Sequence, residues 1–207
     1  MSTIEKIYRQ KHTKSGNLYS DALALFPDGV THDTRYVAPF PIVATHGKGA
    51  RKWDVDGNEY VDYVMGHGAL MLGHSHPEVV TAVSSQMSKG THLGASHIGE
   101  QEWAGWIKHL IPSAERVRFT SSGTEATLLA LRLARARTEK DRIIKFSNHF
   151  HGWNDYLLVG SGRGTAGIPH DISESVKVLT PNDITVVEQT LVEDKNIAAV
   201  ILEPTGA

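Results

Sequence analysis

The fold is decided by the stretch Arg118-Phe119-Thr120-Ser121-Ser122-Gly123-Thr124-Glu125-Ala126-Thr127. The residues up to Phe119 have the pattern of a short strand, which stops at small, flexible residues and turns directly into a helix. The run that follows, from Ala126 to Ala136, is rich in alanine, leucine and arginine and contains few helix breakers. The sequence therefore predicts a strand over Arg116–Phe119, a tight turn and a helix over Thr124–Arg137.

The start of this predicted helix has the features of an anion-binding site. A helix N-terminus leaves several backbone N–H groups unpaired, and its dipole favours a negative charge there. Ser121, Ser122 and Thr124 add hydroxyl donors, and Gly123 lets an anion approach without a Cβ in the way. However, Ser122 and Glu125 also have the spacing of a capping box, which caps many helices that bind nothing. The motif alone leaves both interpretations open.

The composition narrows the class of protein. With 207 residues, 40% of them hydrophobic, the chain can bury one substantial core. A formal net charge of -2 gives no reason to expect nucleic acid or a membrane as a partner. The absence of cysteine excludes disulfides, thiolate catalysis and cysteine-type zinc sites. There is no apolar run of membrane-spanning length and no secretory signal, so we expect a cytoplasmic protein.

Strand and helix patterns alternate through the second half of the chain. Four further strands are predicted, at Arg142–Phe146, Tyr156–Val159, Ser175–Leu179 and Ala198–Glu203. This alternation predicts an α/β fold with a mostly parallel sheet covered by helices on both faces. The region before it differs, because Trp53–Tyr63 has the pattern of a hairpin that turns at Asp56-Gly57-Asn58. We therefore assign residues 1–70 to a small N-terminal α+β domain and residues 71–207 to an incomplete large domain.

Polar residues at strand ends extend the candidate site. Ligands of parallel α/β sheets bind beyond the carboxyl ends of the strands, where Phe150, His151 and Glu203 are expected. The Phe150 ring could stack on a planar ligand or belong to the core. His151 could orient a ligand or be a loop histidine bonded to backbone. The sequence leaves these alternatives open.

Two other groups of residues could bind a ligand. Arg35 could form a fork with a substrate carboxylate, or it could be a solvated surface residue. The 12 histidines include the pairs in His74-Ser75-His76 and His149-Phe150-His151. No carboxylate forms a tight motif with them and the H-E-x-x-H pattern is absent, so we expect no metal site. A zinc enzyme using these histidines remains an alternative that elemental analysis would test.

The end of the sequence suggests a truncated chain. The apolar strand predicted at Ala198–Glu203 is followed only by Pro204-Thr205-Gly206-Ala207. A buried parallel strand is normally followed by a crossover that packs back on the sheet. We therefore expect that the sheet lacks its remaining strands.

Taken in order, these motifs resemble those of the class III pyridoxal-phosphate aminotransferases, in particular the glutamate-1-semialdehyde aminomutase-like subgroup. The resemblance covers nearly the whole chain from about residue 25. It is carried by Phe26-Pro27-Asp28-Gly29-Val30, Trp53–Tyr63, Leu72–Pro77, Arg116–Phe119, Ser122–Ala126, Arg132–Ala136, Phe150-His151-Gly152 and Glu203-Pro204. It implies the type I fold of pyridoxal-phosphate transferases, pyridoxal 5'-phosphate as cofactor, and a homodimer with sites at the subunit interface.

The resemblance also implies roles for particular residues. The implied cofactor-binding residues are Ser122, Gly123 and Thr124 at the phosphate, Phe150 as the ring-stacking aromatic, His151 and Glu203. Arg35 stands where the aminomutases carry a substrate-carboxylate arginine, and His67 stands where they usually have a tryptophan of the substrate pocket. Phe150 replaces a residue that is often tyrosine. These two replacements favour an amino donor or acceptor other than that of a strict aminomutase.

The family's reactive residues lie outside this sequence. The Schiff-base lysine and the ring-nitrogen aspartate are expected downstream of Glu203, while Lys145 and Lys177 have the pattern of ordinary strand residues. No catalytic residue is therefore assigned within the chain. The resulting hypothesis is an N-terminal fragment of an aminotransferase that moves an amino group between an amino acid or amine and a 2-oxo acid. The alternatives are a glutamate-1-semialdehyde 2,1-aminomutase-type isomerase and a non-catalytic gene fragment.

Overall fold

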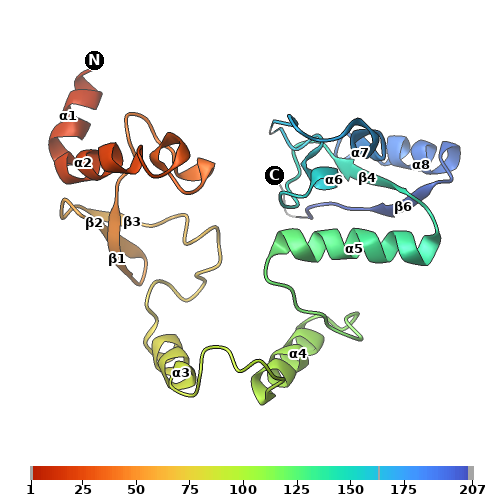
Figure 1. Cartoon of the computed structure of the whole chain (residues 1–207), viewed down its shortest axis with the longest axis horizontal. Coiled ribbons are helices and arrows are strands. Elements are labelled where there is room, and N and C mark those ends of the chain that lie inside the picture. Colours follow the sequence, from red (N-terminus) through yellow and green to blue (C-terminus); the bar gives the residue numbers. More distant parts are fainter. Residues whose placement is uncertain (1, 163, 205–207) are drawn as a thin grey trace. The chain divides into compact units, whose positions relative to one another are not determined.

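The computed structural model describes residues 2–162 and 164–204, which form two compact units (Figure 1). The amino-terminal unit runs to Ser96, and the carboxy-terminal unit begins at His97. The predicted boundary at residue 70 concerns the domains of the whole protein, which differ in definition from these two compact units, and it stays a prediction.

The amino-terminal unit combines helices with a small antiparallel sheet of strand order β1-β2-β3. Its elements are α1 (Thr3–Lys11), α2 (Thr13–Ala22), the 3-10 turns η1 (Pro27–Gly29) and η2 (Asp33–Arg35), β1 (Ala44–Lys48), β2 (Arg51–Asp54), β3 (Glu59–Val61) and α3 (Pro77–Met87). The predicted hairpin is present, because β2 and β3 pair antiparallel with Trp53 opposite Glu59. Gly57 in its turn has φ of +89°, a conformation that favours glycine.

The turn of the hairpin also caps a helix. The Asp56 carboxylate accepts hydrogen bonds from the backbone N–H groups of Lys14 (2.7 Å) and Ser15 (3.0 Å), in the first turn of α2. It also accepts from the Ser15 hydroxyl at 2.8 Å, and that side chain is fully buried. His12, the residue that precedes α2, makes no side-chain cap. A distant carboxylate therefore satisfies the start of α2 and ties the helix to the sheet.

Replacing Asp56 by alanine should open α2 locally. Because two backbone donors and a buried hydroxyl lose their acceptor, we expect a loss of about 1–3 kcal/mol in the local opening free energy. Amide hydrogen exchange of α2 residues measures this quantity directly. Asp21→Ala, at an exposed position of the same helix, is the control. Equal exchange in the two variants would show that Asp56 does not cap α2.

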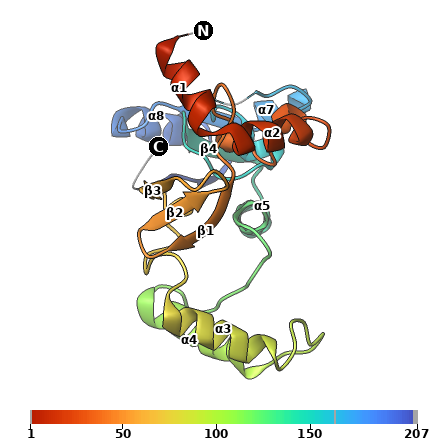
Figure 2. The same cartoon turned by 90° about the vertical axis from the view of Figure 1, so that its left-hand side faces the viewer.

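The carboxy-terminal unit contains a parallel sheet of strand order β5-β4-β6. Its elements are α4 (Ile98–Leu110), α5 (Gly123–Thr138), β4 (Arg142–Phe146), α6 (Asp155–Leu158), α7 (His170–Glu174), β5 (Val176–Leu179), α8 (Ile184–Glu193) and β6 (Ile197–Val200). Figures 1 and 2 show α5 and α8 on opposite sides of this sheet. Leu131 of α5, Ile143 of β4 and Leu157 of α6 form the buried core cluster. The predicted α/β architecture is confirmed.

Two of the predicted strands are wrong. Arg116–Phe119 belongs to no helix or strand, because no described strand pairs with it; its Phe119 ring instead stacks on Trp103 at 3.9 Å between centroids. Tyr156–Val159 was expected to be a strand because it is apolar, but the segment lies largely in the short helix α6. Asn154 caps that helix by accepting a hydrogen bond from Leu157 N at 3.2 Å. This cap stabilises a helical turn in a segment whose apolar pattern predicted a strand.

Candidate functional site

The first turn of α5 forms the centre of the site. Helix α5 begins at Gly123, and the preceding Ser122 caps it by accepting from Glu125 N at 3.2 Å. The Glu125 carboxylate in turn accepts from Ser121 N at 2.7 Å, so the capping interpretation of this motif holds. The helix still leaves the N–H groups of Gly123 and Thr124 without an intrahelical partner. A Cβ built on Gly123 would meet nothing within 4 Å, so the space beside this residue is open to a ligand.

A loop from the end of β4 docks on this helix. The Thr124 hydroxyl oxygen accepts a hydrogen bond from Trp153 N at 3.1 Å, and the Thr127 hydroxyl donates to the His151 carbonyl at 2.8 Å. Between these contacts, Gly152 has φ of +100°, and a Cβ there would lie 2.5 Å from the Thr124 hydroxyl oxygen. Only glycine fits both the backbone conformation and the space. The segment that contains His151 is therefore held directly against the first residues of α5, which include Thr124.

Gly152→Ala should push the loop away from α5. The added methyl group meets both Thr124 side-chain and backbone atoms, and φ is unfavourable for alanine, so we expect about 1–3 kcal/mol of destabilisation. Amide exchange at Trp153 should accelerate, and the melting temperature should fall. Gly164→Ala is the control, because a Cβ there meets nothing within 4 Å. An unchanged Trp153 exchange rate in Gly152→Ala would contradict the close packing.

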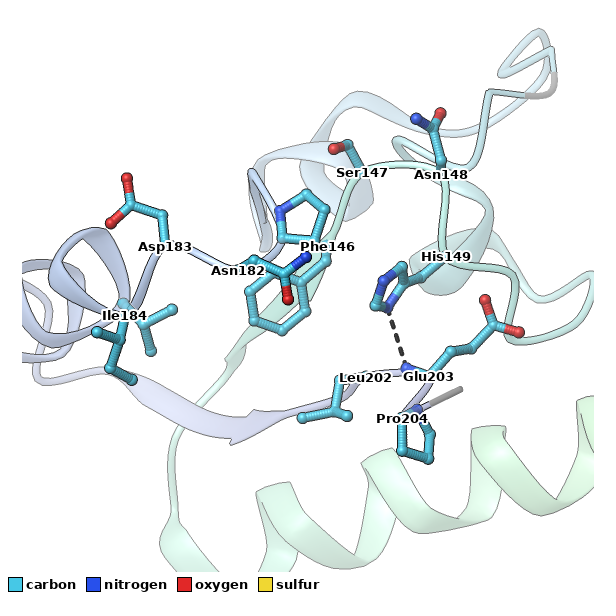
Figure 3. A pocket seen from close by; sticks show the side chains of 12 residues that line it. Phe146, Ser147, Asn148, His149, Asn182, Asp183, Ile184, Leu202, Glu203 and Pro204 are labelled. Carbon is cyan, nitrogen blue, oxygen red and sulfur yellow. Dashed lines mark hydrogen bonds between the residues drawn. The ribbon is translucent and has the colours of Figure 1, made fainter. Parts of the chain in front are cut away.

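Phe150 and Glu203 are linked by a hydrogen bond between a backbone N–H and a side chain. Phe150 N donates to the Glu203 carboxylate at 3.0 Å, and Glu203 N donates to His149 Nδ1 at 3.0 Å (Figure 3). The Phe150 residue is 36% exposed and lies edge-on to the Trp153 ring at 5.9 Å, so it is not part of the buried core. Its position is therefore compatible with stacking on a ligand, which stays a prediction.

A pocket of about 630 Å³ lies at the carboxyl ends of β4 and β6, beside the start of α8 (Figure 3). Phe146, Ser147, Asn148 and His149 line it from the first strand, and Leu202, Glu203 and Pro204 from the second; Pro181, Asn182, Asp183, Ile184 and Val187 complete it. Of the predicted cofactor residues, Glu203 contributes to this pocket. The start of α5 is a separate part of the site.

The Nε2 atom of His151 is buried and lacks a hydrogen-bond partner within the described residues. The residue as a whole is 9% exposed. Burial lowers the pKa of the imidazole, and the nearby Lys145 charge lowers it further. Both effects favour the neutral form of His151, although the charge of Glu203 acts in the opposite direction. Because buried polar atoms are nearly always hydrogen-bonded, the unsatisfied Nε2 fits a site that is completed by a bound group.

Lys145 of β4 was not expected in the site. Its side chain is fully buried, and its Nζ donates to the carbonyl oxygens of Leu157 (2.7 Å) and His149 (3.2 Å). Burial lowers the pKa of Lys145 from its usual 10.5 to about 8, although the charge of Glu203 acts in the opposite direction. The interpretation as an ordinary strand residue missed this. A lysine between the apolar residues Ile144 and Phe146 was the available signal.

The predicted substrate residues lie in the amino-terminal unit. Arg35 ends η2 and is exposed, and its Nη1 donates to the Thr31 hydroxyl at 2.7 Å. His67 is exposed in the loop after β3, with φ of +56° between two glycines that also have positive φ. Asp62 anchors the start of that loop by accepting from Met65 N at 3.1 Å. The binding roles of Arg35 and His67 stay predictions.

One histidine of each predicted pair has a partner other than a metal ion. His74 Nε2 lies 2.7 Å from a carboxylate oxygen of Asp62, and His149 accepts from Glu203 N. The described residues whose ligand atoms come close enough for a metal ion are different ones, on the short helix α7. These are His170, Asp171 and Glu174, which are all exposed.

A family match agrees with this geometry. The sequence model described as "Aminotransferase class-III" matches residues 33–207. The chain belongs to the class III aminotransferases. Among its relatives, the glutamate-1-semialdehyde 2,1-aminomutase of Thermodesulfovibrio yellowstonii is 43% identical over 94% of the chain and 48% of that protein. The enzyme of the same name from Sulfurisphaera tokodaii is 42% identical over 92% of the chain and 47% of that protein. The chain thus spans about half the length of the curated relatives it matches.

Solved structures agree on the fold. An omega-transaminase from Sphaerobacter thermophilus superposes with a TM-score of 0.92 and 33% identity, over 97% of this chain and 49% of that one. A structure described as a transaminase with PLP bound gives a TM-score of 0.90 and 32% identity, over 94% and 48% of the two chains. The family, the pyridoxal-phosphate transferase fold and pyridoxal 5'-phosphate as the family's cofactor are therefore confirmed.

Proposed function

We propose that this chain forms the amino-terminal half of a pyridoxal-phosphate-dependent aminotransferase that moves an amino group between an amino acid or amine and a 2-oxo acid. The observation that carries the proposal is the open first turn of α5 with the segment of Phe150 and His151 docked on it, in a chain of this family. A helix start with open space and a flanking aromatic can hold an anionic group attached to a planar ring.

The start of α5 would hold the cofactor phosphate. The N–H groups of Gly123 and Thr124 have no intrahelical partner, and the helix dipole favours an anion there. The hydroxyl oxygens of Ser122 and Thr124 accept from Glu125 N and Trp153 N, so each hydroxyl hydrogen remains for a phosphate oxygen. The capping and docking contacts thus orient both hydroxyls and leave their donors available.

The loop after β4 would hold the cofactor ring. Phe150 presents an exposed ring, and the Glu203 carboxylate fixes its backbone. His151 contributes a buried imidazole whose Nε2 can form a hydrogen bond with a bound group. When bound, pyridoxal phosphate supplies the carbonyl carbon that takes up the amino group and the ring that stabilises developing negative charge. The residues of this chain bind, orient and enclose it.

Substrate binding and assembly complete the proposal. Arg35 would pair with a substrate carboxylate, and His67 would shape the pocket in place of the aminomutase tryptophan. The lysine that reacts with the cofactor and the aspartate at its ring nitrogen would come from the remaining half of the protein. We further propose a homodimer, which agrees with the exposed Trp103 and Trp106 on α4. No helix within the described residues has the length and apolar character to cross a membrane.

The phosphate contacts can be tested in the full-length protein. Thr124→Val and Ser122→Ala should each raise the dissociation constant for pyridoxal phosphate by about 10- to 100-fold, because a hydrogen bond to a charged group contributes about 1.5–3 kcal/mol. Spectrophotometric titration of the cofactor-free protein measures this. Thr124→Ser, which keeps the hydroxyl, and Thr138→Val, at the other end of α5, are the controls. Unchanged affinity in the Ser122/Thr124 double variant would remove the phosphate assignment.

Two reactions compete for the assignment. The relatives named above are aminomutases, which favours an intramolecular isomerase. His67 and Phe150 depart from the aminomutase pattern, and a structure 33% identical to this chain is an omega-transaminase. The two replaced residues and the omega-transaminase structure favour intermolecular transfer.

Amino-group exchange separates the two reactions. The full-length protein, given a ¹⁵N-labelled amino donor and an unlabelled 2-oxo acid, should deliver the label to the oxo acid, with no turnover when the oxo acid is omitted. Conversion of glutamate-1-semialdehyde without any added oxo acid would establish the aminomutase instead. Turnover in neither assay, despite a complete reading frame, would favour a non-catalytic protein.

A further inference from the structure

Lys145 is buried in an unusual way. Its side chain is fully buried, as are the neighbouring Ile143 and Ile144 of β4. Removing an ammonium group from water is costly, and lysines are almost never fully buried unless they are paired. This ammonium donates hydrogen bonds to two backbone carbonyl oxygens, those of His149 and Leu157. These two bonds do not form an ion pair. They stabilise the arrangement of the backbone that carries the two carbonyls.

The two carbonyls belong to one segment. His149 and Leu157 bound the segment of residues 149–157, which contains Phe150, His151 and Gly152. Its only helical part within the described residues is the first three residues of the four-residue helix α6, which is too short to be stable alone. The segment is therefore held by tertiary contacts. Lys145 holds both of its ends, while Thr124 and Glu203 hold its middle through Trp153 N and Phe150 N.

We propose that Lys145 is a positioning residue for the cofactor site: its ammonium ties together the two ends of segment 149–157 and so fixes Phe150 and His151 beside the start of α5. The inference rests on the proposed function, because that function makes the segment a wall of the cofactor site. The competing explanation is that Lys145 only stabilises the fold of the unit in general.

The experiment compares three variants of the full-length protein. Lys145→Met keeps most of the side-chain length without any donor, and Lys145→Gln keeps a neutral donor. Lys177→Met is the matched control, since Lys177 lies opposite Ile144 on β5 and its side chain is 43% exposed, 3.9 Å from Asp194. All three are purified without cofactor, and amide hydrogen exchange is measured before titration with pyridoxal phosphate.

The proposal predicts a local effect with a consequence for binding. In Lys145→Met, the amides of Phe150 and Trp153 should exchange at least about ten times faster. The hydrogen-bonded amides of helix α5 and strand β4 should keep their rates. The dissociation constant for pyridoxal phosphate should rise by about tenfold or more, and Lys145→Gln should be intermediate. Lys177→Met should change neither quantity.

Other outcomes overturn the proposal in distinct ways. A uniform rise in exchange throughout the carboxy-terminal unit would assign Lys145 to general stability, and unchanged exchange at Phe150 and Trp153 would show that it does not hold the segment. Faster exchange with unchanged cofactor affinity would separate the segment from cofactor binding. If Lys145→Met fails to fold, the same measurements on Lys145→Gln decide the question. If neither variant folds, Lys145 stabilises the fold in general and the proposal is wrong. If the unsubstituted protein binds no pyridoxal phosphate, the proposed function fails, while the exchange result still decides whether Lys145 holds the segment.

Discussion

The close approach of Gly152 to Thr124 is the contact on which the candidate site depends. It brings the chain that leaves β4 against the first turn of α5, where a Cβ would lie 2.5 Å from the Thr124 hydroxyl oxygen. Trp153 N and the His151 carbonyl then reach the hydroxyls of Thr124 and Thr127. A larger residue at position 152 would remove all of these contacts together, because each depends on the backbones staying close.

Around this contact, polar groups are arranged so that each has two functions. The Ser122 and Thr124 hydroxyls accept hydrogen bonds from the protein and keep their own hydrogens available. The Glu203 carboxylate fixes Phe150, while its own backbone N–H donates to His149. Because these groups are positioned before a ligand arrives, little ordering entropy remains to oppose binding. The unsatisfied Nε2 of His151 is the exception, and it lies in the segment that we assign to the cofactor.

The sequence predicted those elements whose signals are local. The strand at Arg142–Phe146 has the predicted bounds, since the signal of a short run rich in apolar residues acts within a few positions. Arg116–Phe119 failed because a strand requires a partner, which the pattern of one segment does not specify. Part of the candidate site was likewise local, since the turn into α5 could be read from Ser121 to Glu125.

The rest of the site depends on contacts between distant residues. Trp153 meets Thr124 across 29 positions, and Phe150 meets Glu203 across 53. The burial of Lys145 involves Leu157 of α6, which accepts its hydrogen bond and packs with Ile143 of β4, so the sequence offered only a lysine between apolar residues. Arg35 and His67 were assigned through resemblance alone, and their own surroundings in the amino-terminal unit do not reveal a ligand. Tertiary packing, which no short pattern encodes, supplied what was missed.

The central claim is that the first turn of α5 binds the phosphate of the cofactor, and a crystal structure of the full-length protein with pyridoxal phosphate tests it most directly. The account predicts phosphate oxygens at about 2.7–3.2 Å from the backbone nitrogens of Gly123 and Thr124, with the Phe150 ring against the cofactor ring. A phosphate bound by other residues, with these two N–H groups facing solvent, would contradict it.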